Sequence, residues 1–172
     1  MSRDGVVRSS KRIIRVTPTL STDAYAQGDV LFTATEIPRA VLEKGGCSKL
    51  ITAYMLDKND QDIDITFVFT EGNTALGTIN ATANISDADL LANNICGTAK
   101  LDHSETSTAG YIDNSRIGQF INMAGNGDQT SMLLFLQAAS NSTSVYVQGI
   151  ITSNVTPTYA ADDIQLIFHI ED

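Results

Sequence analysis

The sequence predicts an all-β protein, a jelly-roll-like β-sandwich with an extended N-terminal arm. Short runs rich in Val, Ile, Thr, Tyr and Phe recur along the chain, separated by clusters of Gly, Asn, Asp, Ser and Pro. Helical periodicity is scarce. A chain of 172 residues that is 42% hydrophobic and 18% charged has the size and composition of one globular domain. Nine candidate strands in such a chain favour two packed sheets.

Each candidate strand is a short apolar or alternating run bounded by turn-forming residues. In chain order, the candidates are Arg12 to Val16, Val30 to Ile37, Lys49 to Leu56, Asp62 to Thr70, Ile95 to Leu101, Ile117 to Asn122, Ser131 to Ala138, Ser144 to Thr152 and Ile164 to Ile170.

Two of these runs alternate clearly between apolar and polar residues, as half-buried strands do. In the run of residues 62–70 the apolar face consists of Ile63, Ile65, Phe67 and Phe69. In the last run it consists of Ile164, Leu166, Phe168 and Ile170, and Ile167 breaks the pattern. We expect both apolar faces to lie in the core.

The run SMLLFLQA, residues 131–138, is apolar on both faces. It is either a strand covered on both sides or a short buried helix. A neighbouring copy of the chain would supply the second cover, so we expect Leu133 and Phe135 to lie at an oligomer interface, with a trimer as the expected assembly.

One short helix is predicted after Ser86, in the segment DADLLANN. The Ser86 hydroxyl suits an N-cap, and Asp87 and Asp89 suit the positive end of the helix dipole. Asn93 and Asn94 would end the helix.

Charge divides the chain into a basic arm, residues 1–16, and an acidic body, residues 17–172. The arm carries +4 and the body −13, which together make the net −9. Because an acidic body repels phosphates, we do not expect nucleic acid binding. The first residues lack the apolar segment of a secretory signal, and no apolar stretch is long enough to cross a bilayer, so we expect a protein made in the cytoplasm with no membrane span.

The acidic segment of residues 57–71 superficially resembles a calcium-binding loop, with Asp60, Asp62 and Asp64 at alternate positions and Glu71 at the twelfth. The sixth position of such a loop is Gly, because the backbone turns there with positive φ. Ile65 stands at this position. We therefore expect a turn that enters a strand, with at most an opportunistic surface calcium ion.

No pattern in the sequence predicts catalysis. Asp102, His103, Ser104 and Glu105 are consecutive, and consecutive side chains do not stack into a catalytic triad. His169 has no partner close to it in sequence, and Cys47 and Cys96 lack the spacing of a metal or redox motif, so we expect free thiols. We predict no enzymatic activity, no catalytic residues, no metal site and no cofactor.

Several segments resemble structural proteins in the virions of tailed bacteriophages, particularly phages of marine bacteria. These segments are LSTDAYAQGDVLF (residues 20–32), Gly45-Gly46 followed by KLITAYMLDK, then DIDITFVF, and finally TPTYAADDIQLIFHIE (residues 156–171). The resemblance covers most of the body. It implies a β-sandwich that decorates or cements the head shell, located on the capsid surface of the virion, with the major capsid protein and neighbouring copies as partners. It supplies no catalytic residues.

A cement protein grips several shell subunits, often by an extended segment that adds to a neighbouring sheet. We expect the arm to be this segment. Its predicted partner-binding residues are Arg8, Lys11, Arg12, Ile13, Ile14, Arg15 and Val16, the cations meeting carboxylates and the apolar residues pairing as a strand.

Three other interpretations of the sequence stay open. In the first, the arm is a frayed basic tail and does not bind a partner. In the second, the protein is a tail or neck component rather than a head protein. In the third, the protein is a receptor-binding or glycan-binding β module. The absence of Trp and the scattered positions of the five Tyr disfavour a sugar site.

Overall fold

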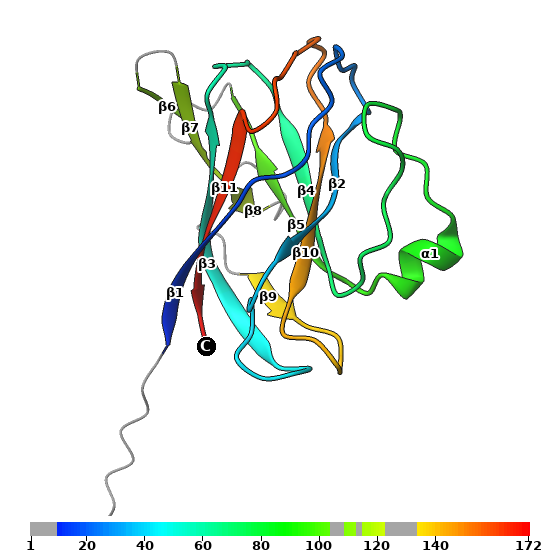
Figure 1. The fold of residues 1–172 in the computed structure, drawn as a ribbon, viewed down its shortest axis with the longest axis vertical. Coiled ribbons are helices and arrows are strands. Elements are labelled where there is room, and N and C mark those ends of the chain that lie inside the picture. The colour runs from blue at the N-terminus through cyan, green and yellow to red at the C-terminus, as the bar shows by residue number, and fades with distance from the viewer. Residues whose placement is uncertain (1–9, 104–108, 113–114, 123–133) are drawn as a thin grey trace, which may run out of the picture.

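The computed structural model describes residues 10–103, 109–112, 115–122 and 134–172. These residues form two antiparallel sheets packed face to face, with one short helix, so the predicted all-β sandwich is confirmed (Figure 1). Within the described ranges, no helix has the length and apolar character needed to span a membrane.

The two sheets contain different strands. In spatial order, the first sheet consists of β1 (Lys11–Val16), β11 (Ile164–Glu171), β3 (Cys47–Asp57), β7 (Ser115–Gln119) and β6 (Ala109–Ile112), and β9 (Leu134–Gln137) also pairs with β3. The second consists of β2 (Val30–Ile37), β10 (Val145–Ile151), β4 (Ile65–Thr70), β5 (Ile95–Leu101) and β8 (Ile121–Asn122).

Strand pairing is nested along the chain. The first strand pairs with the last, and further antiparallel pairs join β2 to β10, β3 to β7 and β4 to β5. These four pairs belong alternately to the first and the second sheet. The chain is therefore folded once into a long antiparallel ribbon, and the ribbon is wrapped so that its successive parts alternate between the sheets.

The core lies between the sheets, and the alternation of the sequence fills it as expected. All eight residues of the two predicted apolar faces are at most 1% exposed. Phe67 of β4 stacks on Phe120 with ring centroids 3.8 Å apart, and Phe168 of β11 meets Phe120 edge-on at 6.3 Å. Aromatic contacts thus connect the second sheet to the first.

The predicted helix is confirmed as α1 (Asp87–Ala92), where the Ser86 side chain accepts a hydrogen bond from the Asp89 amide. It belongs to a segment, residues 71–94, that lies over the outer face of the second sheet (Figure 1). The buried Gln148 of β10 ties this segment down, because its side chain accepts from the Leu76 amide at 2.8 Å and donates to the Thr74 carbonyl at 3.0 Å.

The predicted strands differ from the observed ones mainly where the chain changes sheet. The run from Ile117 to Asn122 is divided into β7 and β8, because Phe120 turns into the core between them. Strand β4 begins at Ile65 rather than Asp62, and β6 has no predicted counterpart. The run SMLLFLQA contains a strand over Leu134–Gln137, and residues 131–133 lie outside the described residues.

The arm prediction requires a correction. Residues 11–16, placed in a separate arm by the sequence, form an edge strand of the body that pairs with β11 from Lys11 opposite Glu171 to Val16 opposite Leu166. Arg12 makes a two-pronged ion pair with Asp172, with N···O distances of 2.9 and 3.0 Å. We expected this strand to add to a partner's sheet, but it pairs with the edge of β11 in its own chain.

This placement predicts different effects for two truncations. Removing residues 1–16 uncovers the edge of β11 and takes away Ile14 and Val16, which pack against the core, so we expect the free energy of unfolding to fall by about 3 kcal/mol or more. Removing residues 1–9 takes away none of the described contacts and serves as the control. Urea denaturation measures both, and equal stability of the two truncated proteins would contradict the assignment of β1.

Candidate functional site

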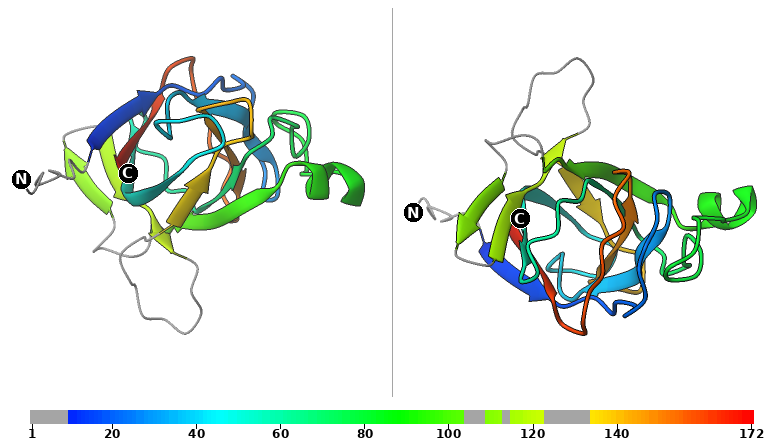
Figure 2. Two further views of the ribbon diagram at one scale, coloured as in Figure 1. Left: turned by 90° about the horizontal axis from the view of Figure 1, so that it is seen from below. Right: turned by 90° about the horizontal axis from the view of Figure 1, so that it is seen from above.

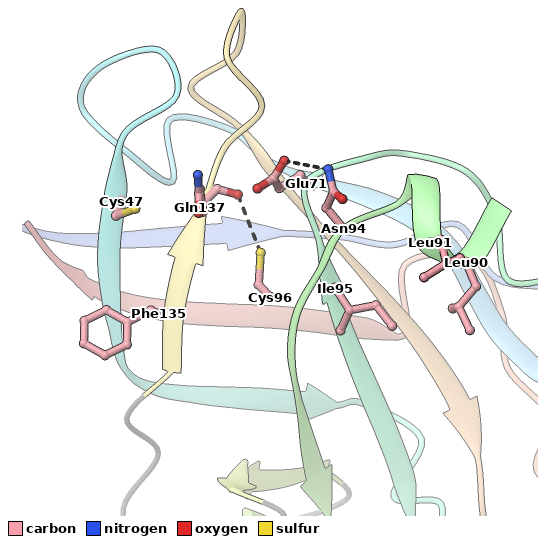
Figure 3. A pocket seen from close by; sticks show the side chains of 9 residues that line it. All are labelled: Cys47, Glu71, Leu90, Leu91, Asn94, Ile95, Cys96, Phe135 and Gln137. Carbon is pink, nitrogen blue, oxygen red and sulfur yellow. Dashed lines mark hydrogen bonds between the residues drawn. The ribbon is translucent and has the colours of Figure 1, made fainter. Parts of the chain in front are cut away.

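An apolar groove of about 730 Å³ lies between α1 and the edges of both sheets (Figure 3). Its wall on the side of the first sheet includes Cys47, Phe135 and Gln137. Its wall on the side of the second sheet and α1 includes Glu71, Leu90, Leu91, Asn94, Ile95 and Cys96.

The groove exists because two strand edges approach each other without forming a ladder. The pairing of β5 with β8 involves Ala99 and Lys100, which leaves the start of β5 beside β9. The Cys96 thiol bridges the gap by donating to the Gln137 carbonyl at 3.6 Å. This junction brings three apolar side chains to the surface, with Leu91 77%, Phe135 66% and Ile95 47% exposed.

The polar groups of the groove do not form a reactive centre. Both cysteines are free. Burial, and then the nearby Glu71 carboxylate, raise the pKa of the Cys96 thiol, although the contact with Gln137 opposes this shift. Because the thiolate is the nucleophilic form, the raised pKa keeps the Cys96 thiol unreactive. Glu71 accepts a hydrogen bond from the Asn94 side chain at 3.1 Å. The groove therefore suits contact with another apolar surface.

The predicted partner-binding residues are distributed over both faces of β1. Lys11, Ile13 and Arg15 point outward, and Ile13 is 53% exposed. Ile14 and Val16 pack against the core, and Arg12 is held by Asp172. Arg8 lies outside the described residues. The outward residues are available to a partner, whereas the inward ones stabilise the body.

Of the two predicted interface residues, Phe135 lies on the outward side of β9, between the buried Leu134 and Leu136. The body therefore covers one face of this strand. Leu133 lies outside the described residues.

The carboxylates of the predicted calcium-like segment point to different partners. Asp60 and Asp62 form ion pairs with the buried Arg116 of β7. Asp64 contacts His103, and Glu71 lies beyond the far end of β4. Because these four groups do not converge, the segment is a turn entering a strand, as the Ile65 argument predicts.

One cluster in the described residues has the spacing of metal ligands. The ligand atoms of Asp64, Asp102 and His103 lie within 4.8 Å of one another. Internal contacts already engage them, because His103 Nδ1 lies 2.7 Å from Asp64 and the Lys100 ammonium lies 2.5 Å from Asp102. A lysine ammonium supplies the positive charge that a cation would bring, and this favours a structural role for the cluster.

Sequence reasoning missed the partner of His103. The Asp64 carboxylate accepts from the His103 amide at 2.9 Å and also meets its ring, so this imidazole has the carboxylate neighbour that the sequence did not reveal. The two residues are 39 positions apart, and no local pattern joins them. His169 contacts the Tyr54 ring edge-on, with centroids 5.6 Å apart.

Asp57, at the end of β3 where the chain turns toward β4, is a fully buried carboxylate. It accepts from the amides of Asn59 and Gln61 at 2.8 and 3.0 Å and from the Tyr159 hydroxyl at 3.3 Å. Burial raises the pKa of Asp57, and the three hydrogen bonds oppose this shift. Burial also raises the pKa of Tyr159, which keeps this hydroxyl a donor.

Comparison of the chain with protein-family models, with curated proteins and with solved structures found no match.

The raised pKa of Asp57 predicts a specific pH dependence of stability. The folded state binds the Asp57 proton more tightly than the unfolded chain does, so protonation of Asp57 stabilises the fold at low pH. This stabilisation is lost as pH rises through the folded-state pKa. Asp57→Asn lacks the titration, and its lost acceptor atom adds a pH-independent offset. We expect the unfolding free energy of the wild type, relative to Asp57→Asn, to decrease from about pH 4 upward. Urea denaturation at several pH values measures this, and a difference that rises with pH would refute it.

Proposed function

We propose that this protein is a non-enzymatic structural protein of a virion, and specifically a decoration or cement protein on the capsid surface. The observation that carries the proposal is the exposure of Leu91, Ile95 and Phe135 around one groove of a well-packed β body. Exposed apolar patches of this kind mark surfaces that contact other proteins. A shell protein and neighbouring copies are the proposed partners.

The strand connections support this class of protein. A single antiparallel ribbon wrapped into two sheets, with β1 beside β11 and β2 beside β10, is compatible with the predicted jelly-roll-like sandwich, which is part of this proposal. Jelly rolls occur in viral capsid proteins, lectins and cupins. The fold is compatible with a virion role without implying one, so the proposal also depends on the exposed groove and on the sequence resemblance to phage structural proteins.

The polar clusters favour a protein without catalysis. Among the described residues, the hydrogen-bond partner of the His103 ring is Asp64, and a carboxylate is not a nucleophile activated by this imidazole. The thiol in the groove has a raised pKa. Both features are consistent with stabilising contacts in a rigid body.

Labelling of intact particles tests the proposal. Antibodies against the purified protein are applied to phage particles from the source, and mass spectrometry measures its copy number. We expect labelling over the head and a copy number that matches positions of the head lattice. Labelling over the tail or neck would support the alternative location, labelling at fibre tips with binding to a glycan array would support the receptor-binding alternative, and absence from particles would refute a virion role.

A substitution in the groove predicts a defect in attachment without a defect in folding. Phe135→Ser removes a side chain that is 66% exposed, so we expect an unchanged circular dichroism spectrum and thermal midpoint. Occupancy on undecorated heads should fall by about tenfold, because the apolar area covered on docking is lost.

Leu42→Ser is the matched control, since Leu42 is 53% exposed and does not line the groove. Cosedimentation measures both variants. Wild-type occupancy by Phe135→Ser would show that the groove does not contact the shell.

A further inference from the structure

The outer faces of the two sheets differ in how they are covered. Residues 71–94 lie over the outer face of the second sheet. The outer face of the first sheet has no such cover in the described residues, and Ile13 and Ile51 are 53% and 38% exposed on it. We call this uncovered surface of β1, β11 and β3 the basic face.

The basic face has a charge opposite to that of the whole chain. Its outward side chains on β1, β3 and β11 include the cations Lys11, Arg15 and Lys49 and one carboxylate, Glu171, on a chain with a net charge of −9. Glu171 lies 3.7 Å from the Lys11 ammonium, so the cations on this face still exceed the carboxylates by two. A hollow of about 360 Å³ lies in it, lined in part by Lys11, Ile13, Ile51 and His169. An acidic surface with an apolar projection is the matching partner.

The chain carries such a surface on α1. Leu91 is 77% exposed, the highest value among the exposed large apolar side chains of the described residues. Asp87 lies four residues earlier, on the same side of the helix, and Asp89 is also exposed. Residues 71–94 contain three carboxylates and no Lys, Arg or His.

The two surfaces lie on opposite sides of the molecule, as β1 and α1 do in Figure 1 and in both views of Figure 2. One copy therefore cannot join its own α1 to its own basic face. We propose that copies of this chain associate head to tail, with Leu91 of one copy seated between Ile13 and Ile51 of the next and with Asp87 facing Lys11 and Arg15.

A contact between two different patches repeats from copy to copy. The assembly closes into a ring if the rotation between copies allows closure, and otherwise it grows into an open filament. The inference deepens the proposed function by naming the contact between neighbouring copies. It relies on that function for its biological setting and not for the contact itself.

Analytical ultracentrifugation of the full-length protein tests the contact. We expect concentration-dependent oligomers of the wild type, weakened about tenfold or more by Leu91→Ser and equally by Ile13→Ser. Leu42→Ser is the matched control, because its exposure equals that of Ile13 and it belongs to neither surface. Circular dichroism confirms that each variant is folded.

Mixing the two variants distinguishes head-to-tail contact from other arrangements. Leu91→Ser retains a working basic face and Ile13→Ser retains a working α1, so an equimolar mixture should form dimers that neither variant forms alone. These dimers should weaken when NaCl is raised from about 0.05 M to about 0.5 M, because the charges are exposed.

Three results would overturn the inference: a wild type that stays monomeric at about 0.5 mM, at which weak contacts form, an oligomer insensitive to Leu91→Ser, or variants that fail to complement each other. A monomeric wild type that still labels phage heads would refute this contact and leave the proposed function intact. If the protein forms these oligomers but is absent from particles, the contact stands and the proposed function is refuted.

Discussion

The stacking of Phe67 on Phe120 is the contact on which the rest of the structure depends. Phe67 belongs to the second sheet, and Phe120 lies where the chain leaves β7 of the first sheet for β8 of the second. The Phe120 amide also donates to the Ala53 carbonyl of β3 at 2.9 Å. Phe168 of β11 and Phe69 of β4 extend the cluster through edge-on contacts. This set of rings holds the two sheets at a fixed separation, and so fixes which side chains of each strand point outward.

The outward side chains then acquire different roles according to what covers them. Over the second sheet, Gln148 is fully buried because the chain returns across it and supplies the Leu76 amide and the Thr74 carbonyl as partners. At one end of the molecule, two buried side chains hold the turn between β3 and β4. Arg116 forms an ion pair with Asp60, and Asp57 accepts a hydrogen bond from the Gln61 amide. Elsewhere large apolar residues stay exposed, and in the described residues all of them except Leu42 lie in the groove beside α1 or on the basic face.

This division is compatible with the proposed structural role. In the described residues, the buried polar groups are engaged by partners within the chain, and burial raises the pKa of Asp57 and Tyr159 beside the turn and of Cys96 in the groove wall. What remains for partners is apolar surface with separated charge, acidic around α1 and basic along β1. Such surfaces determine where and in which orientation a rigid body docks. A decoration protein needs this property and no chemistry.

The sequence alone determined the features that arise from local pattern. Alternation in the runs around Phe67 and Phe168 identified the core faces, because side chains of a strand point alternately to opposite sides. The Ser86 cap identified α1, because the capping hydrogen bond spans only three residues. Ile65 at the position where a calcium loop has Gly predicted a connection into a strand, and Asp60, Asp62 and Asp64 do lie in the connection that leads into β4.

Contacts between distant segments were decided by the tertiary structure. The pairing of β1 with β11 joins residues about 150 positions apart, and it converted a predicted arm into an edge strand. The meeting of Asp64 with His103, and the exposure of Phe135 while Leu134 and Leu136 are buried, follow from the same long-range packing. Composition and periodicity report which residues prefer burial. Which partner supplies the cover depends on how the whole ribbon wraps, and local patterns in this sequence do not encode that.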